Sequence, residues 1–109
     1  MKLSLFNITD FRVDGGAMFG VIPKGMWSKS VKPDGNNNIG LSLRSLVIET
    51  EGRVILTDAG WGDKQDEKFF RYAWLSGGEG LTGGLARCGY KPEDVTDIIL
   101  THLHADHCG

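Results

Sequence analysis

All three histidines of the chain lie in its last segment, residues 101–109, together with one aspartate. The residues with metal-binding side chains are His102, His104, Asp106 and His107. Imidazole nitrogens and carboxylate oxygens are the donors that bind zinc, iron and manganese in proteins. Their spacing differs from that of two histidines four apart on a helix, so we expect an extended or looped backbone. Because the apolar residues 98–100 come directly before, the pattern predicts a metal site at the end of a strand.

The number of donors indicates more than one metal ion. In an extended segment His102, His104 and Asp106 share one face, while Leu103 and Ala105 turn toward a core. Four donors so close together crowd a single ion that must keep an open position for catalysis. Two ions about 3.5–4 Å apart divide these donors more easily. We therefore expect two Zn²⁺ ions, and iron or manganese would fit the same donors.

A simpler interpretation of this segment is a surface histidine tract that binds metal without doing chemistry. The apolar strand predicted directly before the histidines argues against it, because a strand end is a rigid support for a site carried by a loop. We therefore favour a specific site.

The pattern His102-x-His104-x-Asp106-His107 after a hydrophobic strand resembles the signature of the metallo-β-lactamase superfamily. The resemblance implies an α+β fold, the αββα sandwich, in which two sheets lie between helices. It also implies that His102 and His104 bind the first ion and that Asp106 and His107 bind the second. The family's remaining ligands follow this motif and none is present here. We therefore expect residues 1–109 to form the N-terminal portion of a single domain of this kind.

Asp58 is the next candidate for a role in the site, because it follows the predicted strand at residues 53–57. By the resemblance, its carboxylate would orient a metal ligand, as carboxylates bonded to ligating imidazoles do. An aspartate two residues before a glycine can instead bond its own turn. The sequence leaves both roles open. For Cys108, beside His107, we favour a buried apolar side chain over a metal ligand.

The function implied by the resemblance is metal-assisted hydrolysis by an activated water. Two stretches, residues 14–27 and 60–64, are similar to the branch with quorum-quenching lactonases and relatives of methyl parathion hydrolase. An ester, preferably a lactone, is therefore the expected small-molecule substrate, and Asp106 is the expected catalytic residue for proton transfer. An iron-dependent oxidoreductase of the same fold and a catalytically inactive fragment remain alternatives. Four apolar residues fit either a substrate pocket or plain core: Met18, Phe19, Met26 and Trp27.

Composition and charge limit the partners. With 40% hydrophobic and 24% charged residues, the chain has the composition of an ordinary globular domain. The net charge of −2 indicates no basic face that would bind nucleic acid or a membrane. The sequence does not determine the oligomeric state. Two cysteines do not suggest a disulfide framework, and the N-terminal residues alternate instead of forming the apolar run of a signal peptide. We expect a cytoplasmic protein.

The elements that must position these residues follow from periodicity and turn residues. A β-hairpin turning at Gly52 is the clearest, since two apolar runs flank it. A helix ending before Gly89 is next, because glycine is favoured just after a helix. The expected strands are residues 3–8, 17–22, 41–48, 53–57 and 97–100, and the expected helices are residues 63–73 and 81–88, with a short helical turn at residues 91–95.

Overall fold

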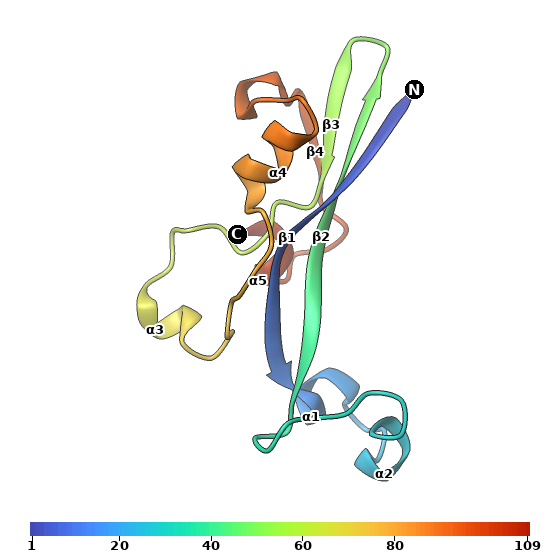
Figure 1. Ribbon diagram of the computed structural model, residues 1–109, viewed down its shortest axis with the longest axis vertical. Helices are drawn as coiled ribbons and strands as arrows, with labels where there is room; N and C mark the ends of the chain where they lie inside the picture. The colour runs from blue at the N-terminus through green and yellow to red at the C-terminus, as the bar shows by residue number, and fades with distance from the viewer.

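The computed structural model describes all 109 residues and shows one twisted sheet with short helices around it (Figure 1). The sheet has four strands in the order β1-β2-β3-β4, in which the first three are antiparallel and β4 runs parallel to β3. The fold is thus of the predicted α+β class. In chain order the elements are β1 (Lys2–Asp14), α1 (Gly15–Phe19), α2 (Lys24–Trp27), β2 (Asn38–Thr50), β3 (Arg53–Thr57), α3 (Glu67–Phe70), α4 (Leu81–Arg87), a 3-10 helix (Pro92–Asp94), β4 (Asp97–Ile99) and α5 (Ala105–Cys108).

The predicted hairpin is confirmed as β2 and β3. Its turn consists of Glu51 and Gly52, whose φ angles are 48° and 75°. Two left-handed residues in succession give a turn whose twist matches that of the flanking strands. This turn sets the register, with Thr50 opposite Arg53 and Leu46 opposite Thr57.

The strands β1 and β2 extend well beyond β3 and form a long two-stranded arm with α1 and α2 at its far end (Figure 1). The molecule is correspondingly elongated, with extents of 49 × 30 × 23 Å. The predicted strand at residues 3–8 is confirmed but continues to Asp14, because pairing with β2 persists to Asn38. A β-bulge between Asn7 and Thr9 shifts the register along the way.

The strand expected at residues 17–22 is wrong, since that stretch contains α1 and a turn. The side chain of Asp14 accepts a hydrogen bond of 3.0 Å from the backbone of Ala17 and so begins a helix at this point. Capping of the first free amides favours the helical turn over an extended backbone.

The helix expected at residues 63–73 is reduced to the single turn α3. Asp66 caps it by accepting a 2.9 Å hydrogen bond from the backbone of Phe69. Beyond α3 the backbone bonds to the edge of β1 instead, through Arg12 to Ala73 at 2.9 Å and Asp10 to Ser76 at 2.8 Å. A backbone that pairs with a strand cannot also continue a helix.

The remaining predictions agree with the structure. The helix at residues 81–88 is α4, which is followed by Gly89 with φ of 92°. The expected helical turn is the 3-10 helix, and the last expected strand is β4. None of the helices has the length and the apolar character needed to cross a membrane.

The core lies between α4 and one face of the sheet. Its buried cluster consists of Phe6, Ile8, Phe11, Leu43, Val47, Leu56, Leu85 and Tyr90. The opposite face, to which Leu3 and Leu5 belong, leaves these side chains 60% and 58% exposed. The chain therefore provides one helical layer and one sheet, and the second face of that sheet is apolar and open.

The close contact between α4 and β1 can be tested at Gly84, where a Cβ atom would lie 2.0 Å from the ring of Phe6. We expect Gly84→Ala to destabilise the fold by about 1–3 kcal/mol through overpacking. Gly83 has nothing within 4 Å of the same position. Gly83→Ala should therefore stabilise the same helix by about 0.5–1 kcal/mol. Urea unfolding midpoints measure both variants, and equal midpoints would contradict the packing described here.

Candidate metal centre

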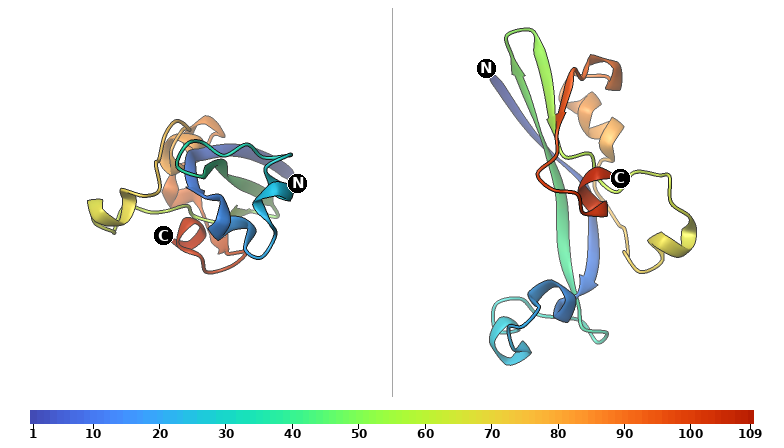
Figure 2. Two further views of the ribbon diagram at one scale, coloured as in Figure 1. Left: turned by 90° about the horizontal axis from the view of Figure 1, so that it is seen from below. Right: turned by 180° about the vertical axis from the view of Figure 1, so that it is seen from behind.

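The candidate site lies where β3 and β4 end. The two strands are parallel neighbours, and Thr57 is paired with Ile99, so both chains leave the sheet at the same edge. Crevices beyond the carboxyl ends of parallel strands commonly form binding sites. The loop after β3 begins with Asp58, and the loop after β4 carries the histidines and leads into α5 (Figure 2).

Asp58 connects these two loops through its buried carboxylate, and the residue is only 5% exposed. Its Oδ1 accepts a 2.8 Å hydrogen bond from the backbone of Thr101, and the Thr101 hydroxyl donates to Oδ2 at 2.9 Å. Oδ2 also lies 2.9 Å from Nδ1 of His107. The carboxylate thus bonds the histidine loop and makes no hydrogen bond to its own turn, although φ of 59° places Asp58 in the left-handed region.

The electrostatics of Asp58 favour its ionised form. Burial by itself raises the pKa of the carboxyl group, but the hydrogen bonds from Thr101 and His107 together outweigh burial and lower that pKa. A buried carboxylate is stable only when such partners satisfy it. Because the Asp58 carboxylate accepts a hydrogen bond from Nδ1 of His107, the ring carries its proton on Nδ1. Nε2 is then the nitrogen available to a metal.

Backbone hydrogen bonds hold the same two loops together. The amide of Asp58 donates to the carbonyl of Ile99, the amide of Ala59 to that of His107, and the amide of Gly109 to that of Gly60, each at 2.8 Å. The position of the histidine loop therefore depends on backbone pairing as well as on side chains. Sequence analysis did not identify Thr101; its place directly after the last strand was the available signal.

The structure brings the predicted donors His102, His104, Asp106 and His107 into one cluster. The ring of His102 lies 4.0 Å from that of His107 and 4.8 Å from that of His104, measured between centroids. Nε2 of His107 lies 3.2 Å from an oxygen of Asp106. Two ligands of a tetrahedral zinc ion, each about 2.0–2.2 Å from it, lie about 3.4 Å apart. The last pair thus has the separation of two donors to one ion.

The cluster is not a complete coordination sphere, because no group of three His, Cys, Asp or Glu side chains is arranged around a common point. The donors fit a metal ion by their chemistry and, for Asp106 and His107, by their separation. Nδ1 of His102 lies 2.9 Å from the Thr101 hydroxyl, so this ring also presents Nε2.

Two details of the predicted loop are wrong. Leu103 and Ala105 do not turn toward a core, since both are exposed, Leu103 by 78%. Cys108 is not buried either: it is exposed on α5, and its Sγ lies 3.5 Å from the carbonyl oxygen of His104. For Ala105 and Cys108 the difference follows from the helical turn α5, which rotates side chains that an extended chain would alternate.

An open cleft of about 810 Å³ adjoins the donor cluster. Its walls include all four candidate donors and, from β1, α1, β2 and the loop after β3, the apolar residues Phe11, Val13, Ala17, Met18, Leu41, Leu43 and Trp61. Four apolar residues were expected to line either a substrate pocket or the core. Met18 lines the cleft, whereas Trp27 is buried and stacks on Phe19. Met26 is 63% exposed. The donors therefore face a largely apolar cleft.

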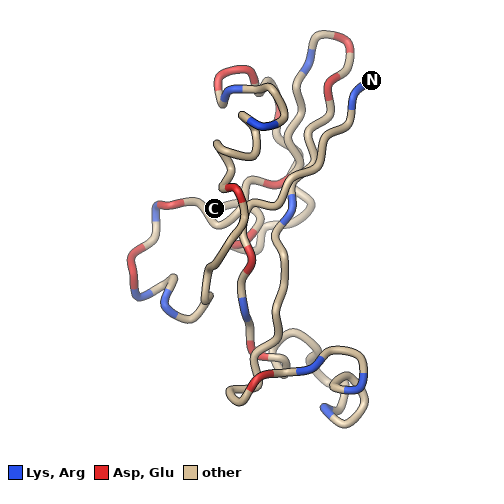
Figure 3. The backbone as a smooth tube through the Cα atoms, in the orientation of Figure 1, with Lys and Arg blue, Asp and Glu red and all other residues tan.

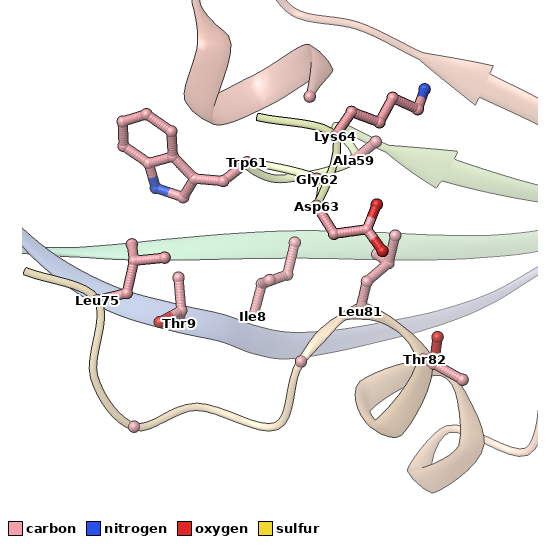
Figure 4. Close-up of a pocket in the computed structure, with 13 residues that line it drawn as sticks. Ile8, Thr9, Ala59, Trp61, Gly62, Asp63, Lys64, Leu75, Leu81 and Thr82 are labelled. Atoms are coloured by element: carbon pink, nitrogen blue, oxygen red, sulfur yellow. The ribbon is translucent and has the colours of Figure 1, made fainter. Parts of the chain in front are cut away.

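A second cleft, of about 550 Å³, shares Trp61 with the first (Figure 4). Ile8, Leu81 and Asp63 are among its walls, and none of the candidate donors is. Trp61 lines both clefts and packs edge-on against Phe11, with ring centroids 5.5 Å apart. Its indole thus forms a wall of the cleft that contains the donors.

Comparisons with known proteins agree with this arrangement. The family model described as the metallo-beta-lactamase superfamily matches residues 41–109. A probable metal-dependent hydrolase from Staphylococcus aureus, known from a crystal structure, has 33% sequence identity to this chain and superposes with a TM-score of 0.85. The match covers 97% of this chain and 39% of the hydrolase chain. AidC, a dizinc quorum-quenching lactonase in complex with a product, is 23% identical over 96% of this chain and 34% of its own, with a TM-score of 0.66.

Curated relatives are similar over shorter stretches. An N-acyl homoserine lactonase from Bacillus cereus is 34% identical over 83 residues, which are 67% of this chain and 33% of the relative. The exodeoxyribonuclease WalJ of Streptococcus pneumoniae is 34% identical over 68 residues, or 62% of this chain and 20% of the relative. The chain therefore spans about a third of the length of the lactonase that it matches.

Asp58→Asn tests how far the buried carboxylate supports the donors. The amide keeps the size of the side chain and tolerates the left-handed backbone, but it removes the charge that holds His107. We expect zinc affinity to fall about 10–100-fold, as for other carboxylates bonded to ligating histidines. Competition with a chromophoric chelator measures this in the protein as its gene encodes it. Asp63→Asn, an exposed change farther along the same loop, is the control, and equal affinities in both variants would contradict the role.

Proposed function

Because this chain belongs to the metallo-beta-lactamase superfamily, we propose that the protein is a metal-dependent hydrolase that acts on an ester, preferably a lactone. The observation that carries the proposal is the shared position of the donors and the apolar cleft. His102, His104, Asp106 and His107 all line the cleft that Leu41, Leu43 and Phe11 also line. A site of this kind suits a small molecule with a polar reacting group and an apolar remainder.

The donors would hold zinc, with His102 and His104 on one ion and Asp106 and His107 on a second. Zinc is favoured by the imidazole and carboxylate set, and iron or manganese is compatible with it. A bound divalent ion supplies Lewis acidity toward the substrate carbonyl and makes a water acidic enough to act near neutral pH.

The residues of this chain then have distinct tasks. Asp58 orients His107, since its hydrogen bond to Nδ1 determines which ring nitrogen faces the cleft, and Thr101 holds the Asp58 carboxylate in place. The apolar walls receive the acyl part of the substrate and exclude water from it. Asp106, half-buried and 3.2 Å from Nε2 of His107, would pass a proton toward the leaving group.

The main competing function is nucleic-acid hydrolysis, because one relative is an exodeoxyribonuclease. The cleft argues against it, since most of its walls are apolar and Arg44 is the only basic side chain besides the histidines among them. Proteins that act on nucleic acids gather positive charge along the backbone path. Several relatives named N-acyl homoserine lactonase support a lactone instead.

We also propose that residues 1–109 form the N-terminal portion of one domain of this family. The match to the Staphylococcus aureus hydrolase covers nearly the whole of this chain but only 39% of the hydrolase chain. The open apolar face of the sheet at Leu3 and Leu5 supports this, because a second sheet packed there would bury it. Further metal ligands would then come from outside these residues.

Lactone hydrolysis tests the proposal directly. The protein as its gene encodes it should open an N-acyl homoserine lactone, lose the activity after treatment with a chelator and regain it with zinc, because the ions provide the activated water. A pH-indicator assay follows the acid released. Hydrolysis of single-stranded DNA but not of the lactone would select the nuclease, whereas oxygen consumption that requires iron would select an oxidoreductase.

Asp106→Asn separates catalysis from simple metal capture. We expect kcat to fall at least about 100-fold, since the amide can neither transfer a proton nor balance the charge of an ion. Metal content measured by mass spectrometry on the same sample shows whether one ion is lost as well. Asp97→Asn, which changes a carboxylate on β4 that is paired with Arg53 outside the cleft, is the control. Full activity with full metal content in Asp106→Asn would refute both roles.

A further inference from the structure

The far end of the β1–β2 arm, here called the arm tip (residues 15–33), exposes large apolar side chains. Val21 is 99% exposed, Met26 63%, Met18 48% and Ile22 46%. They belong to α1, α2 and the turn between these helices, at the end of the molecule farthest from the β2–β3 turn (Figure 1). Single exposed apolar residues are ordinary, but several on one projection mark a contact surface.

The charge of the arm tip is of one sign. Residues 15–33 contain Lys24, Lys29 and Lys32 and no acidic residue. None of these lysines forms an ion pair, and all of them are exposed. The neighbouring acids are engaged within the fold: Asp14 caps α1, and Asp34 lies 3.2 Å from Arg12.

The base of the arm tip is rigid enough to present these side chains. Trp27 is buried and stacks on Phe19 with ring centroids 4.8 Å apart. Its ring also fills the space beside Gly15, where a Cβ atom would lie 2.4 Å away. The buried indole thus joins the two short helices and leaves Val21 and Met26 outside.

We propose that the arm tip docks onto a lipid surface that carries anionic headgroups. Apolar side chains that enter the headgroup region, with lysines around them, are the chemistry of proteins that lie on such membranes. A second copy of the chain fits less well, because a two-fold contact would bring the lysines of both copies together. Nucleic acid would meet the lysines but would leave Val21 and Ile22 in water.

This proposal departs from the expectation of no membrane partner, which rested on the net charge of −2. The sum conceals the local charge, because the end of the arm carries lysines while acidic residues lie only where it joins the strands (Figure 3). The two acids there, Asp14 and Asp34, are engaged by α1 and by Arg12. The proposal does not depend on the hydrolase function. If that function holds, the cleft adjoins the lipid surface, because Met18 belongs to both the cleft and the arm tip.

Vesicle sedimentation tests the proposal with the protein as its gene encodes it. The probes are vesicles of phosphatidylcholine and phosphatidylglycerol in equal amounts, and vesicles of phosphatidylcholine alone. We expect binding to the anionic vesicles that weakens as salt is added. Lys29→Gln/Lys32→Gln should reduce the partition coefficient about 25-fold, since each basic residue near the surface contributes about fivefold. Lys68→Gln/Arg71→Gln removes the same charge at α3 and should leave binding unchanged.

The apolar part is tested at Val21, whose near-complete exposure means that a substitution there does not disturb the core. Val21→Asp should weaken vesicle binding. In a protein whose native cysteines are replaced by serine, Val21→Cys should react rapidly with a water-soluble maleimide and be protected by anionic vesicles. Three results would each overturn the proposal: equal binding to both kinds of vesicle or to neither, an equal loss in the α3 control, or slow labelling of Val21→Cys without vesicles. The last would mean that protein covers the arm tip, and light scattering would show whether that protein is a second copy.

Discussion

The buried carboxylate of Asp58 is the contact on which the candidate site depends. A charge with 5% exposure requires hydrogen-bond donors, and Thr101 and His107 supply them across 43 and 49 residues of sequence. By satisfying Asp58, the histidine loop takes one position against the end of β3. The same contacts select the ring nitrogen that His107 presents, so the fold and the proposed metal site share one interaction.

The sheet is asymmetric, and this asymmetry organises the rest of the molecule. On one face α4 approaches β1 closely enough that only glycine fits at position 84 beside Phe6. On the other face Leu3 and Leu5 stay exposed, which suits the proposal that a second sheet packs there. The arm of β1 and β2 extends past both layers and carries α1 and α2 away from the core (Figure 1). Core, cleft and arm tip therefore follow one another along a single sheet, with Phe11 and Leu43 shared by core and cleft and Met18 shared by cleft and arm tip.

Local interactions explain which elements could be predicted. The β2–β3 hairpin followed from apolar runs on either side of Gly52, and α4 from its periodicity and from Gly89, because these signals act between near neighbours. The strand expected at residues 17–22 failed because a capping side chain at Asp14 outweighed apolar composition. The helix expected at residues 63–73 failed because Ala73 and its neighbours bond to β1, which lies far away in sequence.

The sequence by itself determined which donors the site contains, since imidazole and carboxylate chemistry belongs to the residues and their close spacing keeps them together. It also implied the superfamily, which the family model matches over residues 41–109. Only the tertiary structure decided that Asp58 contacts His107 and not its own turn, that Leu103 and Cys108 face outward, and that Trp61 forms a wall of the cleft. These outcomes depend on the parallel pairing of β3 with β4, which joins segments distant in the chain and which no local pattern specifies.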